Sequence, residues 1–183
     1  DIATHLAYVA GKENVEAEPD ALHIIAQKAD GALRDALSIF DQIVSFAGNK
    51  VTYKAVLENL NILDYEYYFR ITGELLAGNI SGALLTFDEI IRHGFDGHNF
   101  IGGLCSHFRD LLVCRDEATL QLLEVSPGIR EKYRKQAAAC PPEFLLRALD
   151  TAGQCDMQYR TARNQRFHVE LCLLKLSGLA HAP

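Results

Sequence analysis

The sequence predicts an all-α fold in which a small helical bundle is followed by a larger α-helical domain. In nearly every segment of the 183-residue chain, apolar residues recur at the three- and four-residue spacing of amphipathic helices. Runs of β-branched residues as long as a strand are absent. Residues that begin or end helices, chiefly Asp, Thr, Pro and Gly, stand where these segments meet. Together these observations favour two packed helical modules.

The first 60 residues predict a compact unit of four helices. Each helix has a recognisable start or stop, and the residues that supply them are Asp1, Pro19, Asp20, Gly31, Gly48, Asn49 and Thr52. The third helix carries the apolar stripe that we expect to be buried, formed by Leu33, Leu37, Phe40 and Val44. A unit of this size has only marginal stability by itself.

From about residue 60 the predicted helices become longer and alternate with short loops. Asp64 caps the first of them, Gly94 ends the second and Asp96 opens the third. A looser stretch around Pro127 precedes "GIREKYRKQAAA", and the paired prolines at 141–142 open the next helix. The segment "NQRFHVELCLLKLSGL" forms the last predicted helix.

The composition excludes several classes of protein. A net charge of −6, spread over both modules, argues against an autonomous nucleic-acid binder. The five cysteines are odd in number and form no C-x-x-C, which indicates reduced thiols and neither a disulfide framework nor a zinc site. No apolar run approaches the roughly 18 residues of a membrane span. We therefore expect a cytoplasmic protein with no membrane contact.

The chain begins at Asp1 without an initiator methionine, inside a predicted helix. We expect it to be a piece of a longer protein, so that its function depends partly on segments that it does not contain.

Arg34 occupies an unusual position in the stretch "GALRDALSIFDQ". It lies one turn from the predicted start of the third helix, where the exposed amide dipoles disfavour a cation. Free amides and an arginine fork together suit a phosphate. The alternative is a weak surface ion pair of Arg34 with Asp30, Asp35 or Asp41. Periodicity alone favours this second interpretation.

The other polar clusters give weaker signals. His93, Asp96, His98 and His107 lie near one another in the sequence, but their spacing crosses a helix boundary and matches no metal template. The clusters "IREKYRK" and "RTARNQR" could meet phosphates or an acidic neighbour, although solvated helix faces are the simpler interpretation. The aromatic run "YEYYF" favours packing between helices over base stacking. No motif of a catalytic site is present, so we expect no catalytic residue and no metal ligand.

Residues 29–46, "ADGALRDALSIFDQIVSF", resemble the second-sensor helix of bacterial clamp-loader ATPases, whose usual form is A-x-G-S-[ML]-R-D-A-L-S-L-x-D-Q. The sequence departs from this form at Ala32, where the family often has serine. The positions that match are Gly31, Leu33, Arg34, Asp35, Ala36, Leu37, Ser38, Asp41 and Gln42. The chain is thereby similar to the gamma/tau subunit of DNA polymerase III, an AAA+ protein. The resemblance covers most of the chain and is strongest at residues 20–60.

This resemblance implies a helical AAA+ lid at residues 1–57 and a collar, or oligomerisation, domain at residues 60–183. It implies that Arg34 reaches the phosphates of ATP and that Leu33 makes a contact of the lid near the nucleotide. ATP would be bound mainly by an ATPase domain outside this chain, so we expect no cofactor in the chain alone. The parent protein would be an ATPase within the DNA polymerase III holoenzyme, a DNA-directed DNA polymerase and nucleotidyltransferase.

The implied partners are the other clamp-loader subunits, which the collar would assemble into a pentameric ring. The sliding clamp and primer-template DNA would be met only through the whole complex. Two alternatives stay open: a helical adaptor or scaffold without a nucleotide role, and the lid of another AAA+ remodeler. The adaptor interpretation predicts that Arg34 is buried in an internal ion pair.

Overall fold

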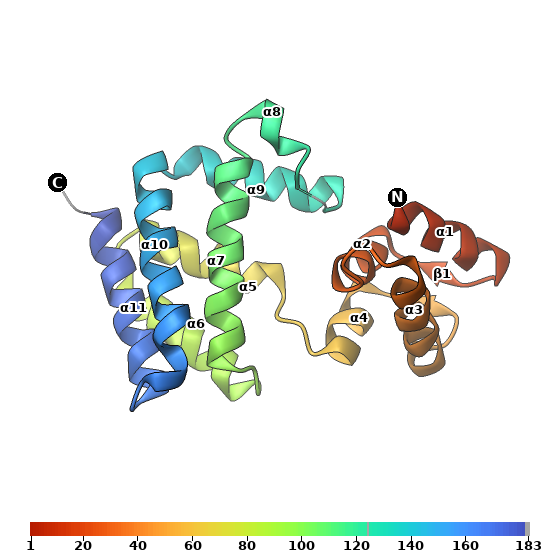
Figure 1. The fold of residues 1–183 in the computed structure, drawn as a ribbon, viewed down its shortest axis with the longest axis horizontal. Helices are drawn as coiled ribbons and strands as arrows, with labels where there is room; N and C mark the ends of the chain where they lie inside the picture. The colour runs from red at the N-terminus through yellow and green to blue at the C-terminus, as the bar shows by residue number, and fades with distance from the viewer. Residues whose placement is uncertain (124, 182–183) are drawn as a thin grey trace. The chain divides into compact units, whose positions relative to one another are not determined.

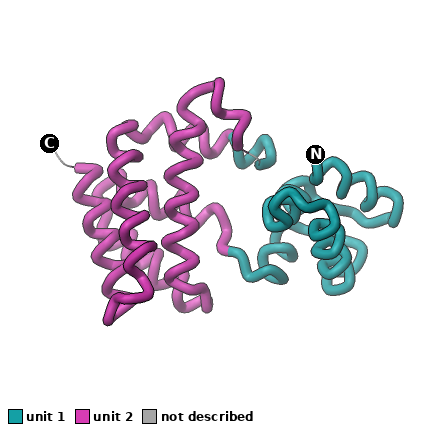
Figure 2. The backbone as a smooth tube through the Cα atoms, viewed as in Figure 1, with its two compact units in different colours: residues 1–62, 124–130 teal, residues 63–123, 131–183 magenta. Residues whose placement is uncertain are grey.

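The computed structural model describes residues 1–123 and 125–181 (Figure 1). The chain forms two compact units, which Figure 2 colours separately. Unit 1 contains residues 1–62 and 124–130, and unit 2 contains residues 63–123 and 131–183. The all-α prediction is confirmed, because the described strands amount to one pair of two residues each.

Unit 1 is built from short helices and this single strand pair. Its elements are α1 (Ile2–Lys12), β1 (Glu16–Ala17), α2 (Pro19–Lys28), α3 (Leu33–Ala47), β2 (Lys50–Val51) and α4 (Tyr53–Leu60). The two strands pair in parallel, with Glu16 opposite Lys50 and Ala17 opposite Val51. Strands of two residues show no periodicity, which is why the sequence did not predict them.

The predicted starts of α1 and α4 are confirmed by their side-chain caps. The Asp1 carboxylate accepts from the Ala3 amide at 2.8 Å, and the Thr52 hydroxyl accepts from the Ala55 amide at 3.1 Å. A second cap on α4 comes from the end of β1, because Glu18 accepts from the Tyr53 amide at 2.9 Å. The strand pair is thus tied to the start of α4.

The core of unit 1 corrects the predicted stripe of α3. Phe40 is fully buried, as expected, but the other buried positions of the helix are Ala36 and Ile43. Leu33 is 41% exposed, because the first residue of a helix projects back beyond the neighbours that cover its middle turns. Leu37 and Val44 lie at the edge of the interface and are partly exposed. The predicted stripe therefore lay about one residue away from the buried face, around the axis of the helix.

Unit 2 consists of longer helices. They are α5 (Tyr65–Leu76), α6 (Ile80–Arg92), α7 (Gly97–Val113), α8 (Glu117–Leu120), α9 (Pro127–Ala139), α10 (Pro142–Gln158), the 3₁₀ turn η1 (Tyr159–Thr161) and α11 (Gln165–Ala180). The boundary between the two units falls within α9, after Arg130. The sequence pattern does not predict α8, because its single turn is too short for a periodic signal.

Helix ends in unit 2 follow the predicted signals. Asp64 and Asp96 cap α5 and α7 by accepting from the backbone amides two residues on, at 3.2 and 3.1 Å. Gly94 follows α6 with φ of 88°, a left-handed conformation that suits glycine after a helix. Arg115 satisfies the end of α9, because its guanidinium donates to the carbonyl oxygens of Ala137 and Cys140.

Close helix packing forms the core of unit 2. α7 packs against α10, α10 against α11, and α5 against α6, as the ribbon shows (Figure 1). Gly103 of α7 is required by the ring of Tyr68, since a Cβ there would lie 1.9 Å from the Tyr68 hydroxyl oxygen. The ring of Tyr68 stacks on Phe100, with centroids 5.9 Å apart. The α5–α7 contact thus depends on one small residue facing one large aromatic residue.

Candidate functional site

The start of α3 is formed by a sharp left-handed turn after α2. Asp30 and Gly31 have φ values of 49° and 82°, and the second of these is favourable only for glycine. Ala32 then occupies the N-cap position in extended conformation and offers no side-chain acceptor. The first backbone bond of the helix runs from the Ala36 amide to the Ala32 carbonyl, at 3.0 Å.

This geometry leaves donors available at the N-terminus of α3. The amides of Leu33, Arg34 and Asp35 make no hydrogen bond within the described part of the chain. Such amides carry partial positive charge and are favourable for an anion. The sequence departs from the family pattern at Ala32, where a serine could have capped the helix.

Arg34 is exposed at the second position of this helix. Among the described residues it makes neither an ion pair nor a hydrogen bond, and Asp30, Asp35 and Asp41 do not approach it within ion-pair distance. Ser38, Asp41 and Ser45 continue its exposed polar face along α3. The weak surface ion pair that periodicity favoured is therefore absent from this part of the molecule.

Leu33 lies beside Arg34 at the first position of α3, and its side chain is 41% exposed. The structure thus brings together an exposed leucine, uncapped amides and an arginine that has no ion partner among the described residues. A fork of charged donors beside free amides can bind phosphate oxygens from two directions.

The histidine-rich segment does not assemble into a metal site. His93 faces the Tyr67 hydroxyl at 3.3 Å, and His98 lies 3.1 Å from the Asp156 carboxylate. Asp96 serves as the cap of α7, and His107 is buried in the core. No group of three or more metal-ligating side chains occurs within the described residues.

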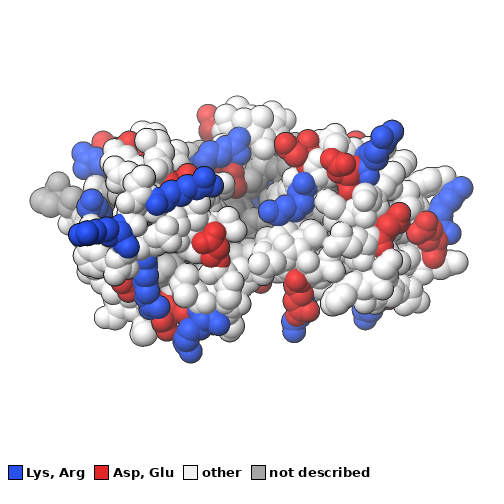
Figure 3. All heavy atoms as spheres, turned by 60° about the horizontal axis from the view of Figure 1, so that its bottom comes forward, with Lys and Arg blue, Asp and Glu red and all other residues white. Residues whose placement is uncertain are grey.

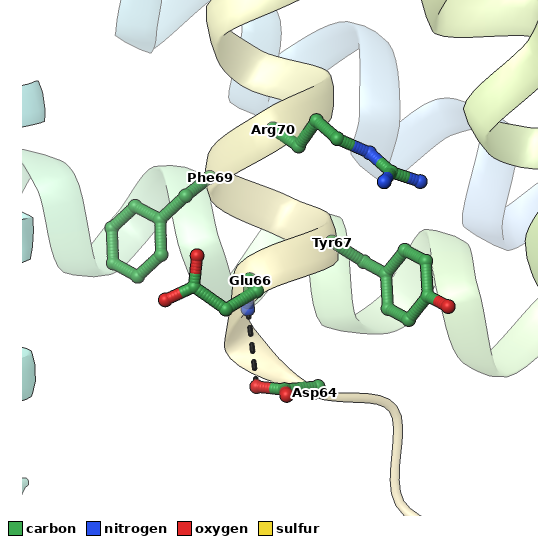
Figure 4. Close-up of a pocket in the computed structure, with 5 residues that line it drawn as sticks. All are labelled: Asp64, Glu66, Tyr67, Phe69 and Arg70. Carbon is green, nitrogen blue, oxygen red and sulfur yellow. Dashed lines mark hydrogen bonds between the residues drawn. The ribbon is translucent and has the colours of Figure 1, made fainter.

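The aromatic run of α5 packs between helices, as predicted. Tyr68 stacks on Phe100, and Phe69 meets Tyr133 edge to face with centroids 4.8 Å apart. A shallow depression of about 590 Å³ opens beside the first turns of this helix (Figure 4). Figure 4 shows Arg70 and Tyr67 projecting from the side of the helix opposite to Phe69.

The charges at this depression are already satisfied. Arg70 binds Glu89, and that hydrogen bond lowers the pKa of the Glu89 carboxyl. Glu66 binds Lys132 from α9. Two of the three charged side chains that line the depression, Glu66 and Arg70, are therefore already engaged in ion pairs within the described residues.

Each of the two basic clusters contains surface residues that pair with carboxylates of unit 2. Arg134 lies 3.2 Å from Glu117, and Arg166 lies 2.7 Å from Asp88. On the face drawn in Figure 3, acidic and basic side chains are interspersed over the surface. Neither cluster forms the continuous basic field of a nucleic-acid site.

Two family models together span almost the whole chain. Residues 1–49 match the ATPase lid domain of the DNA polymerase III clamp loader subunit. Residues 51–183 match domain III of the DNA polymerase III subunits gamma and tau. The chain belongs to the gamma and tau family of DNA polymerase III. The resemblance that the α3 motif indicated is thereby confirmed.

Individual gamma and tau relatives align with nearly the full length of this chain. The tau subunit of Bacillus subtilis is 26% identical over 94% of this chain, and that of Escherichia coli is 25% identical over 95%. The chain spans 31% and 27% of the lengths of these two relatives. The solved structure of the Bacillus subtilis DNA clamp loader delta protein has the same fold, with a TM-score of 0.57 and 16% identity. That match covers 96% of this chain and 55% of the delta protein.

No helix in the described ranges of this gamma and tau family member has both the length and the apolar composition of a membrane span. What the structure offers for function is the N-terminus of α3 in unit 1 and the helical surfaces of unit 2.

Proposed function

We propose that this chain is the lid and collar portion of a clamp-loader ATPase subunit that acts in DNA replication. Residues 1–57 form the lid, and residues 60–183 form the collar through which clamp-loader subunits assemble. ATP is held mainly by an ATPase domain outside this chain. Family membership over both parts supports this division of roles.

In this proposal Arg34 binds the ATP phosphates and Leu33 lies against the nucleotide-bearing domain. The observation that carries it is the exposed Arg34 without an ion partner, beside the uncapped amides of α3. A ligand can shift a conformational equilibrium only through contacts that differ between the two states. If the lid reaches the phosphates only in its closed position, this contact favours the closed state. Binding of ATP would thereby change the position of the lid and, through it, the assembly of the subunits.

The adaptor interpretation fits the structure less well. It requires Arg34 to be buried in an internal ion pair, whereas the side chain is exposed and makes no ion pair with any described residue. The sliding clamp and primer-template DNA are partners of the assembled complex in our proposal, and not of this chain alone.

The test is the substitution Arg34→Ala in the full-length protein. We expect ATP-dependent opening of the sliding clamp by the reconstituted complex to fall at least tenfold, because a charged hydrogen-bond donor to phosphate is lost. The matched control is Lys50→Ala in β2, an exposed cation that follows the opposite end of α3 and makes no ion pair with a described residue, and it should keep wild-type activity. An unchanged ATP response of Arg34→Ala, with the fold intact, would refute the role of Arg34.

A further inference from the structure

α11 carries apolar side chains on two opposite faces. Its inner face, represented by Val169, Leu173 and Leu176, is buried within unit 2. Its outer face presents Phe167, Leu171 and Leu174, which are 57%, 37% and 39% exposed. We call these three residues the α11 stripe. Their spacing of four and three residues places them on one side of the helix.

A helix that is apolar on all sides is normally covered on all sides. Single exposed apolar residues need no explanation, but a row of three along one helix does. In the described part of unit 2, the exposed apolar residues of α6 behave differently. Ile80 and Leu85 are five positions apart and point in different directions. The α11 stripe is therefore a surface that a partner is expected to cover.

The neighbouring helix α10 has a second exposed apolar face. Leu146 and Met157 are 61% and 79% exposed. They are separated by three helical turns and so share one side of the helix. Their side lies opposite the core positions of α10, such as Ala148 and Ala152, which are fully buried. We call the α10 face the exposed side of this helix that carries Glu143, Leu146, Arg147, Asp150 and Met157.

The charges around these two surfaces are complementary. Lys175 is exposed beside the α11 stripe, and Arg163 is exposed just before the helix begins. Neither forms an ion pair with a described residue. The α10 face carries two exposed carboxylates, Glu143 and Asp150, against one cation, Arg147. Opposite charges at the rim orient an apolar contact and disfavour other registers.

We infer that the α11 stripe packs against the α10 face of a second copy of this chain. The inference rests on the proposed collar function and adds which surfaces meet. Both halves of the contact are present on one chain, so a second copy supplies the missing partner surface. Because the two halves differ, the contact is head-to-tail, the type that builds rings rather than closed pairs. Phe167 and Met157 supply the aromatic and thioether side chains that are enriched at the cores of interfaces.

The test uses two disabling variants of the full-length protein. Leu171→Asp with Leu174→Asp removes the α11 stripe, and Leu146→Asp with Met157→Asp removes the α10 face. Sedimentation velocity should show that each variant alone self-associates at least tenfold more weakly than wild type. Leu85→Asp is the matched control, since Leu85 is 68% exposed but lies outside both surfaces, and it should associate like wild type. Circular dichroism checks that every variant is folded at the temperature of the association measurement. Some loss of melting temperature is expected for the α11 variant, because Leu171 and Leu174 are only 37% and 39% exposed.

Mixing the two variants identifies the partner and the geometry. Each variant keeps one intact half, so an equimolar mixture should form one-to-one dimers and nothing larger. A mixture that stays monomeric, or variants that each associate like wild type, would overturn the inference. So would a loss of binding to other clamp-loader subunits with self-association unchanged.

Clamp loading by the wild-type protein is measured in the same preparation. Normal clamp loading together with unaffected variants would overturn this contact while leaving the proposed function standing. Absence of both self-association and clamp loading in wild type would overturn the proposed function itself.

Discussion

At the scale of single residues, His107 is the buried group whose protonation the fold opposes. Its Nε2–H donates to the Gln136 side-chain oxygen at 2.7 Å, and Gln136 in turn donates to the Phe69 carbonyl at 2.9 Å. Nδ1 of His107 is buried and has no partner in the described structure. Burial lowers the pKa of His107 from 6.5 to about 4. The neutral imidazole is therefore part of the native core.

This lowered pKa predicts how stability depends on pH. Above pH 6.5 the imidazole is neutral in both folded and unfolded states, so its full contribution is present. As pH falls from 6.5 to about 4, the unfolded state binds the proton more readily, and this stability is lost. We expect a loss of about 3 kcal/mol from this group.

The measurement is urea unfolding of wild type and His107→Leu at pH 7, 5.5 and 4. The variant starts less stable, because Gln136 loses its partner, but its stability should decline less steeply with falling pH. Replacing the exposed His5 by Leu should leave the wild-type slope. Parallel slopes for wild type and His107→Leu would contradict the assignment.

Also at the scale of single residues, Ala32 leaves the start of α3 without a side-chain cap. A protein that needed only stability would place a serine, threonine or aspartate at Ala32, at a gain of roughly 1 kcal/mol. Sequence reasoning identified Arg34 by its position against the helix dipole, and the structure shows that it is exposed. It could not show that Asp30, Asp35 and Asp41 stay unpaired with it, because that depends on rotamers and on the turn at Gly31.

At the scale of elements, the helix caps were the features that the sequence predicted most accurately. Thr52, Asp64 and Asp96 each cap the helix that the sequence assigned to them, because a cap depends only on neighbouring residues. The buried face of α3 was predicted less accurately, because it depends on which helices pack against α3. The pairing of β1 with β2 joins residues more than 30 positions apart and left no local pattern.

The packing of α5 on α7 gives a prediction at this scale. Gly103→Ala places a methyl group against the Tyr68 ring, whose buried hydroxyl end has little room to move. We expect a loss of about 1–3 kcal/mol in the free energy of unfolding from overpacking. Gly153→Ala in α10 is the matched control, because its Cβ would meet nothing within 4 Å, and it should be neutral or stabilise by about 0.5–1 kcal/mol.

Thermal or urea unfolding of the two glycine variants measures these changes in the free energy of unfolding. If Gly103→Ala and Gly153→Ala have equal free energies of unfolding, Tyr68 can shift without cost. The contact between α5 and α7 would then not require glycine at position 103.

At the scale of the whole molecule, we propose a phosphate site in unit 1 and assembly surfaces in unit 2. The sequence predicted the two helical modules and the family, because the motif at residues 29–46 is dense and specific. It did not predict that residues 124–130 group with unit 1, since this grouping rests on tertiary contacts alone. The exposed faces of α10 and α11 also needed the structure, because apolar residues all around a helix look like ordinary core in the sequence.

The most direct test of the central claim is nucleotide affinity in the full-length protein. A non-hydrolysable ATP analogue is titrated into wild type, Arg34→Ala and the control Lys50→Ala. If the start of α3 binds the phosphates, Arg34→Ala should weaken binding about 10- to 100-fold while Lys50→Ala matches wild type. Equal affinities for all three proteins, each correctly folded, would contradict the claim that this lid senses ATP through Arg34.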